Sequence, residues 1–120
     1  MNLSYRHEGD VGIVRVHAER LDAAAAIRFK DLFGELTGGG PGAGAGTVLL
    51  DLTEVEFLDS SGLGAIVGAR KLLGTGRGLE LGGLQPAVRK VIGLTHMDRI
   101  FAVHDDAAAF LAAQGRPEAV

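Results

Sequence analysis

Residues 48–73, VLLDLTEVEFLDSSGLGAIVGARKLL, contain the change of pattern that decides the fold of this chain. They open with a continuous apolar run, which is typical of a strand covered on both faces of a sheet. From Asp59 to Leu73 the small and apolar residues follow helical spacing, and either Asp59 or Ser60 can cap the first turn. The stretch therefore predicts a buried strand followed by a helix, with Ser60 and Ser61 at the junction.

Strand and helix patterns alternate on both sides of this stretch. Upstream, β-branched segments up to His17 predict a hairpin, and residues 22–37 predict a helix capped by Asp22, with an apolar stripe that includes Ile27 and Phe29. The downstream patterns predict a strand over 78–84, a helix from Pro86 to 95, a last strand over 99–104 and a final helix over 105–115. The predicted order is β-β-α-β-α-β-α-β-α. We therefore expect one α/β domain over residues 1–120, with a mostly parallel, mixed sheet and right-handed crossovers.

A glycine-rich segment, GGGPGAGAG at residues 38–46, separates the first predicted helix from the third predicted strand. Glycine resists ordering, and the segment has no large side chain to pack, so it predicts a flexible surface loop. The alternative is a phosphate-binding loop. A P-loop, however, needs a Lys-Ser/Thr pair after its glycines, and none follows here.

Composition narrows the class of protein and its location. The chain has 120 residues, 47% of them hydrophobic, and a net charge of −3 with acids and bases interspersed, which argues against a nucleic-acid surface. The N-terminal segment lacks the apolar core of a signal peptide, and no apolar run reaches the length of about 20 residues needed to span a bilayer. We therefore expect a cytoplasmic protein that binds neither nucleic acid nor membranes.

The residues that usually carry catalysis form no recognisable constellation. Leu58 and Asp59 stand two positions before the serines, where a hydrolase elbow needs glycine. Cysteine is absent, and the four histidines are scattered without metal-ligand spacing (His7, His17, His96 and His104). We therefore expect no enzyme activity, no metal and no cofactor.

The paired serines leave two interpretations open. In the first, they belong to a helix cap and nothing more. In the second, a hydroxyl in the first helical turn faces solvent at the positive end of the helix dipole. A phosphate there would add a charge of about −2 and change the surface without unfolding the domain. An exposed hydroxyl would favour the second interpretation.

Nearly the whole chain resembles the STAS domain of bacterial anti-sigma factor antagonists. The most specific match is Asp59-Ser60-Ser61-Gly62-Leu63-Gly64 behind the strand over 48–58. Residues 83–101, GLQPAVRKVIGLTHMDRIF, fit a second stretch of the family pattern. This resemblance implies a sheet with helices packed mainly on one side, and a serine that acts as a switch.

The resemblance also implies partners and a mechanism. In the family, the unphosphorylated antagonist binds an anti-sigma factor that is also a serine kinase, which frees a sigma factor; phosphorylation ends the binding, and a PPM-type phosphatase restores it. The phosphoacceptor of the family, the serine directly before glycine, falls on Ser61. The partner-facing surface maps to Leu21, Asp22, Asp59, Ser60, Ser61, Gly62, Leu63 and Gly64.

Two departures from the family pattern affect these expectations. Glu19 and Arg20 stand where relatives commonly have glycine, so the turn before Leu21 is either strained or built differently. The glycine-rich segment is longer than the usual connection, and added loop length costs little. The alternative function is a STAS module that does not switch, such as a scaffold or an accessory subunit for small-ligand or lipid transport.

Overall fold

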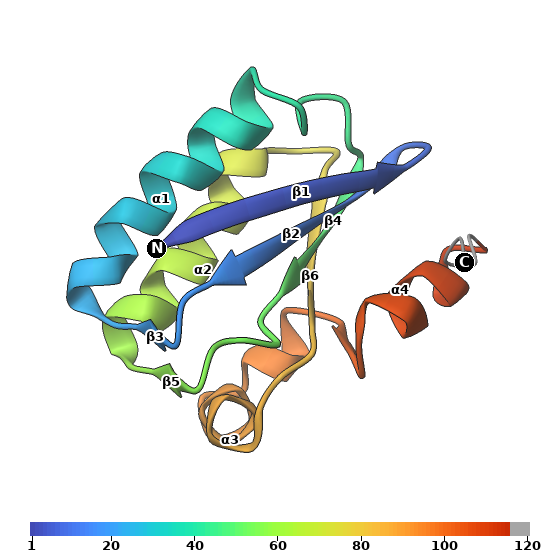
Figure 1. Cartoon of the computed structure of the whole chain (residues 1–120). Helices are drawn as coiled ribbons and strands as arrows, with labels where there is room; N and C mark the ends of the chain where they lie inside the picture. Colours follow the sequence, from blue (N-terminus) through green and yellow to red (C-terminus); the bar gives the residue numbers. More distant parts are fainter. Residues whose placement is uncertain (116–120) are drawn as a thin grey trace.

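A five-stranded mixed sheet forms the centre of the protein, seen in a computed structural model that describes residues 1–115 (Figure 1). Its strand order is β1-β2-β4-β6-β7, and the strands are β1 (Asn2–Glu8), β2 (Val11–His17), β4 (Thr47–Asp51), β6 (Gly78–Gly82) and β7 (Val103–His104). The first two strands pair antiparallel and all other neighbours pair parallel, which confirms the predicted hairpin and mostly parallel sheet. Residues 116–120 of the predicted domain lie outside the described residues.

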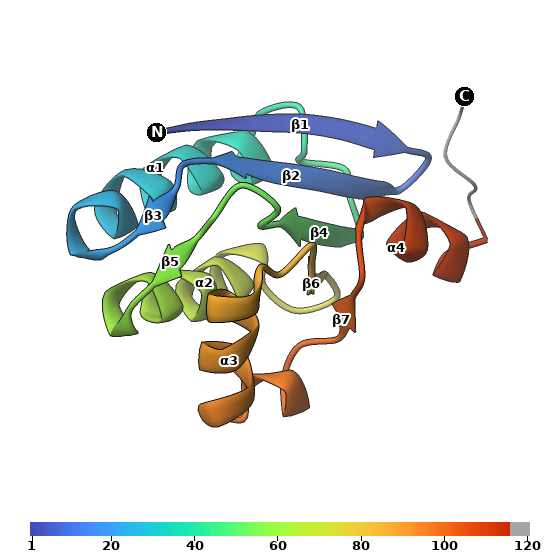
Figure 2. The same cartoon turned by 60° about the horizontal axis from the view of Figure 1, so that its bottom comes forward.

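Helices cover both faces of this sheet unequally. They are α1 (Ala23–Gly38), α2 (Ser60–Leu73), α3 (Pro86–Leu94), the 3₁₀ helix η1 (Met97–Arg99) and α4 (Ala107–Ala113). Figure 2 shows α1 and α2 side by side on one face, with the short α4 on the opposite face. Pro86 opens α3 as predicted. Within residues 1–115, no helix combines the length and the apolar character that crossing a membrane requires.

The larger part of the core lies between the sheet and the helix pair α1–α2. Phe29 and Phe33 of α1 are fully buried, with ring centroids 5.6 Å apart. A smaller cluster on the other face joins Ile13 and Leu49 of the sheet to Phe110 of α4. The predicted stripe is wrong at Ile27, which is 70% exposed because it lies on the side of α1 away from the sheet.

A second sheet, which the sequence patterns do not predict, contains two very short strands. β3 (Arg20–Leu21) pairs parallel with β5 (Phe57–Leu58), Arg20 opposite Phe57 and Leu21 opposite Leu58. Two residues are too few to produce an alternating pattern, so the chain gives no local signal for either strand. This small ladder leads directly into the N-termini of α1 and α2 (Figure 1).

The glycine-rich segment is a surface loop, as predicted, but Gly42 and Ala45 are buried, contrary to the expectation that nothing in it packs. Gly38 is the last residue of α1, and the side chain of Ala45 is only 4% exposed. The Arg77 guanidinium donates to the backbone carbonyl oxygens of Thr37 at 3.0 Å, Gly42 at 2.8 Å and Ala45 at 2.8 Å. Arg77 therefore holds the loop in place from a distant part of the sequence. No local sequence pattern indicates these hydrogen bonds.

The last predicted strand, over residues 99–104, is much shorter in the structure. It begins only at Val103, because the backbone N–H groups of Ile100 and Phe101 both donate to the carbonyl of Met97, at 3.0 and 2.9 Å. Before them His96 adopts a left-handed conformation with φ 58°. The segment thus turns locally through η1, and only the last two residues of the predicted strand join the sheet.

Candidate functional site

The N-termini of α1 and α2 lie next to each other at the end of the small ladder. Asp22 follows β3 and caps α1, accepting a hydrogen bond from the Ala25 N–H at 3.1 Å. Asp59 follows β5 and caps α2, accepting from the Gly62 N–H at 3.0 Å. The sequence left the cap of α2 open between Asp59 and Ser60, and the structure assigns it to Asp59.

Gly62 allows these two helix ends to approach closely. It is buried, and a Cβ atom placed on it would overlap the carbonyl oxygen of Leu21 and lie 2.7 Å from Cδ1 of Leu58. A backbone carbonyl held in a ladder has little freedom to move away. The close contact between α2 and β3, two segments far apart in the sequence, therefore accounts for the need for glycine at position 62.

The two serines occupy the first and second positions of α2, and both are exposed. Within residues 1–115, neither hydroxyl has a hydrogen-bond partner. Since the Asp59 carboxylate already caps the helix, the serine hydroxyls are not needed for that purpose. They are presented to solvent at the positive end of the helix dipole.

The structure brings the predicted site residues together at one end of the molecule, where some are buried and others reach solvent. Leu21 and Gly62 are buried and support the surface from below, while Leu63 is half-buried against the core. The remaining ones reach solvent at least in part: Asp22, Asp59, Ser60, Ser61 and Gly64. A partner at this end of the molecule would therefore meet the first turns of both helices.

Sequence reasoning missed an arginine–aromatic stack beside the serines. The Arg20 guanidinium carbon lies 3.9 Å from the centroid of the Phe57 ring, which is 38% exposed. Arg20 Nε also lies 3.4 Å from Oδ2 of Asp22. The signal would have been the pairing of β3 with β5, because it makes Arg20 and Phe57 direct neighbours.

The turn before Leu21 is built differently rather than strained. Among the described residues other than glycine, His96 alone has a positive φ, so Glu19 does not occupy the left-handed region. Its carbonyl oxygen instead accepts hydrogen bonds from the backbone N–H groups of Glu56 at 2.7 Å and Phe57 at 3.0 Å. These bonds extend the small ladder and hold the turn in place.

Carboxylates dominate the charge of this end of the molecule. The segments that lead into the two helices carry the carboxylates of Glu19, Asp22, Glu56 and Asp59 and the single basic side chain of Arg20. The pKa of Asp22 is lowered, first by the hydrogen bond from the Ala25 N–H and further by Arg20. Asp22 is therefore held in its charged form, and a further negative charge on a nearby serine would meet an already acidic surface.

Comparison with known proteins agrees with the fold. The sequence model of the STAS domain matches residues 2–109. An anti-sigma factor antagonist from Mycobacterium paratuberculosis is 25% identical with a TM-score of 0.79, over 93% of this chain and 92% of that one. The Bacillus cell fate determinant SpoIIAA in its phosphorylated form is 18% identical with a TM-score of 0.64, over 95% and 98% of the two chains.

The same fold also forms part of a much larger membrane protein. The murine anion transporter Slc26a9 matches with 21% identity and a TM-score of 0.74, over 92% of this chain but 19% of the transporter. That likeness shows the fold alone. The family match covers most of the chain and includes both helix N-termini described above. This protein belongs to the STAS domain family.

Proposed function

We propose that the chain is a cytoplasmic bacterial anti-sigma factor antagonist, a single STAS domain switched by phosphorylation of Ser61. Its unphosphorylated form binds an anti-sigma factor with serine-kinase activity and so releases a sigma factor. Phosphorylation of Ser61 by that partner ends the binding, and a PPM-type phosphatase restores it. The protein acts by binding and not by catalysis.

The observation that carries this proposal is the exposure of the Ser61 hydroxyl, together with its lack of a structural role in the helix cap. It is exposed, it has no hydrogen-bond partner within the described residues, and Asp59 performs the capping that would otherwise explain a serine there. A kinase could therefore reach the hydroxyl without breaking a structural contact. The likeness to SpoIIAA, an anti-sigma factor antagonist that has been solved in a phosphorylated form, supports the same role.

A phosphate on Ser61 would change the surface more than the fold. It carries a charge of about −1.5 to −2 and gains from the helix dipole, which offsets part of its repulsion by Asp59. A partner that fits the neutral serine would have to desolvate this charge in an interface that already contains the carboxylates of Asp22 and Asp59. Binding should therefore weaken while the domain stays folded.

Phosphosite mapping tests the proposal. The protein is incubated with Mg-ATP and each kinase-type anti-sigma factor encoded in the same genome, and the phosphate is located by mass spectrometry. We expect stoichiometric label on Ser61, its loss in Ser61→Ala and its retention in the matched variant Ser60→Ala. Binding to such a partner without label on wild type would reject the switch and favour the STAS scaffold or transport-accessory role.

A further inference from the structure

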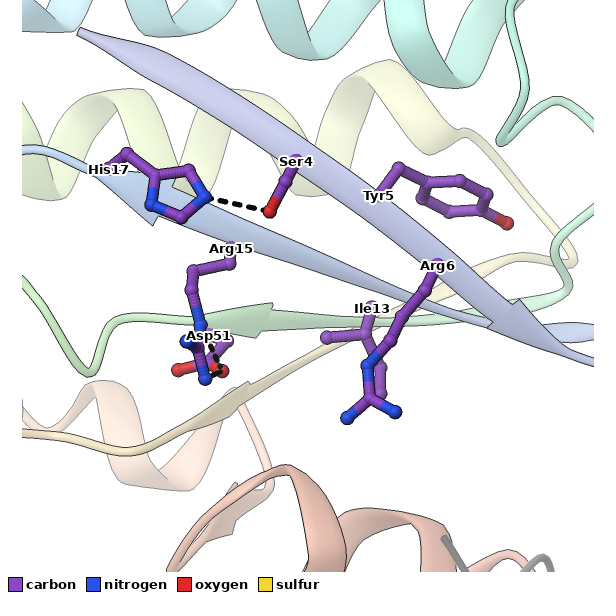
Figure 3. A pocket seen from close by; sticks show the side chains of 7 residues that line it. All are labelled: Ser4, Tyr5, Arg6, Ile13, Arg15, His17 and Asp51. Atoms are coloured by element: carbon purple, nitrogen blue, oxygen red, sulfur yellow. Dashed lines mark hydrogen bonds and ion pairs between the residues drawn. The ribbon is translucent and has the colours of Figure 1, made fainter. Parts of the chain in front are cut away.

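A serine, a histidine and a glutamate form a chain of hydrogen bonds on the face of the sheet opposite α1 and α2. Nε2 of His17 lies 2.8 Å from Oγ of Ser4, as Figure 3 shows, and Nδ1 of His17 lies 2.8 Å from Oε2 of Glu54. The same order of nucleophile, base and orienting carboxylate activates the serine in hydrolases of unrelated folds. No local pattern of the sequence indicates it, because 13 positions separate Ser4 from His17 and 37 separate His17 from Glu54.

Strand pairing brings these three side chains together. β1 and β2 pair antiparallel with Ser4 opposite Arg15, and His17 stands two residues further along β2, so Ser4 and His17 are diagonal neighbours on one face. Glu54 lies in the turn that follows β4, the strand on the other side of β2. The nucleophile and the base therefore both belong to regular strands of the main sheet.

The hydrogen bonds determine which nitrogen of His17 carries a proton. An ionised carboxylate only accepts hydrogen bonds, so Glu54 accepts from the Nδ1–H of His17. In the neutral imidazole Nε2 then carries the lone pair, and the hydroxyl of Ser4 donates to it. His17 is therefore placed to take the proton of Ser4 when the oxygen attacks, and Glu54 to hold the resulting imidazolium in position.

An electrophile has access to the Ser4 hydroxyl. Ser4 is exposed and lines an open groove with a volume of about 390 Å³, together with His17, Arg15 and Asp51 (Figure 3). Oδ2 of Asp51 accepts from Nε of Arg15 at 3.0 Å and lies 3.0 Å from its Nη2, which holds the guanidinium in place. Its remaining N–H groups can stabilise the negative charge that develops on a carbonyl oxygen under attack.

We propose that Ser4 is an activated nucleophile that small activated acyl donors, such as aryl esters and thioesters, acylate. The Ser4 oxygen forms an ester bond to the acyl carbon, and the bond from that carbon to the phenolate or thiolate breaks. His17 accepts the hydroxyl proton and passes it to the leaving group. The reaction modifies the chain stoichiometrically. None of the three residues belongs to the proposed partner surface, so the reactivity is independent of the switch at Ser61.

Acetylation by p-nitrophenyl acetate tests this reactivity in the whole protein. Absorbance follows the release of p-nitrophenolate, and mass spectrometry of peptides separates acetyl groups on Ser4 from those on the amino groups of the chain. Ser60 and Ser61 are internal controls, because they are exposed serines whose hydroxyls have no hydrogen-bond partner within the described residues. A positioned base contributes at least about a hundredfold in rate, so Ser4 should be acetylated at least about a hundred times faster than either.

Two histidine substitutions separate the effect of the base from general effects. His17→Asn removes the base and should lower the rate of Ser4 acetylation about a hundredfold. His7→Asn is the matched control and should leave that rate unchanged. His7 is an exposed residue of the same hairpin, but its ring stacks beside Tyr5 and does not line the groove. Neither histidine is buried, so both variants should fold.

Glu54→Gln tests the carboxylate as a positioning residue. Glutamine keeps the length of the side chain and an acceptor oxygen but loses the charge, so the rate of Ser4 acetylation should fall about tenfold. The ¹⁵N–¹H NMR spectrum of the imidazole should show the Nδ1-protonated form of His17 in wild type and a weaker preference for it in the variant. The urea midpoint should not change, because the Glu54 side chain is 45% exposed.

Two results would overturn the proposal. One is acetylation of Ser4 that is no faster than that of Ser60 and Ser61 in the wild-type protein, a comparison that depends on no substitution. The other is an equal rate of Ser4 acetylation in wild type and His17→Asn.

Discussion

Leu21 and Leu58 are direct neighbours in the parallel ladder of β3 and β5, and each is followed by the aspartate that caps a helix. The pairing therefore places the first turns of α1 and α2 at the same level. Gly62 then brings α2 against the backbone of Leu21. The proposed partner surface depends on this one short ladder, and it can be tested by changing the residues that hold it together.

Substitution of Gly62 by alanine should strongly destabilise the fold. The added methyl group would overlap the Leu21 carbonyl, so α2 or β3 must shift, at a cost of about 3 kcal/mol. Gly64→Ala is the matched control: its Cβ would meet no atom within 4 Å, and alanine should stabilise the exposed helix position by about 0.5–1 kcal/mol. Urea unfolding followed by circular dichroism measures both, and equal stabilities would contradict the close contact.

Ser61→Asp should separate binding from folding. Its negative charge lies near the positive end of the α2 dipole, so the Tm should stay within about 2 °C of wild type. Affinity for the kinase-type anti-sigma factor should fall clearly, as measured by isothermal titration calorimetry. Equal affinity of wild type and Ser61→Asp would argue against the switch.

Ser61→Ala should bind the same partner and should not be released from it when ATP is added.

Asp22 should make the stability of the protein depend on acid pH. Its folded-state pKa lies below the ordinary 3.8, so its charged form stabilises the fold fully above pH 3.8. This contribution is lost as the pH falls through the lowered pKa. Asp22→Asn keeps a side-chain oxygen for the cap but no charge, so it should be less stable than wild type at neutral pH.

Urea unfolding at several pH values checks the sign of this effect. The difference between wild type and Asp22→Asn should narrow once the pH drops below 3.8. Arg20→Gln should retain most of the pH dependence, because the Ala25 N–H lowers the pKa of Asp22 more than Arg20 does. A wild-type advantage that stays constant down to the acid limit would contradict this assignment.

Arg77→Ala should loosen the glycine-rich loop. Three backbone carbonyls lose a charged donor, which should cost about 2 kcal/mol of stability and speed amide hydrogen exchange over residues 40–46. Burial raises the pKa of Tyr5, and Arg77 partly counteracts that shift, so the variant should raise the pKa further. Ultraviolet titration reads this directly because the chain has one tyrosine. Arg70→Ala is the control and should leave the pKa of Tyr5 unchanged. An unchanged pKa of Tyr5 in Arg77→Ala would contradict the electrostatic effect of Arg77 on Tyr5.

The longer elements could be predicted from the sequence because their signals are local. Asp22 and Asp59 are N-caps next to helical patterns, Pro86 marks a first turn, and the run from Val48 predicts a buried strand. Each of these signals lies within a few residues of the element that it predicts. The prediction failed at Ile27, an apolar residue of the helical pattern that lies on the exposed side of α1.

The candidate site was only partly predictable for the same reason. The serines and the capping aspartates stand in one short motif, but the pairing that brings Arg20 onto Phe57 joins distant segments. Likewise the order of the glycine-rich loop comes from Arg77, a side chain about thirty positions away. A single sequence carries no periodicity that reports such contacts.

The β3–β5 ladder also determines when during folding the serine surface comes into existence. The hairpin of β1 and β2 joins adjacent segments and closes a short loop, whereas Leu21 must find Leu58 across all of α1 and β4. Contacts of long sequence separation form late, since the entropy of closing the chain must be overcome first. A partner that docks on both helix ends therefore recognises only molecules whose folding is complete, and nascent or partly unfolded chains cannot compete for it.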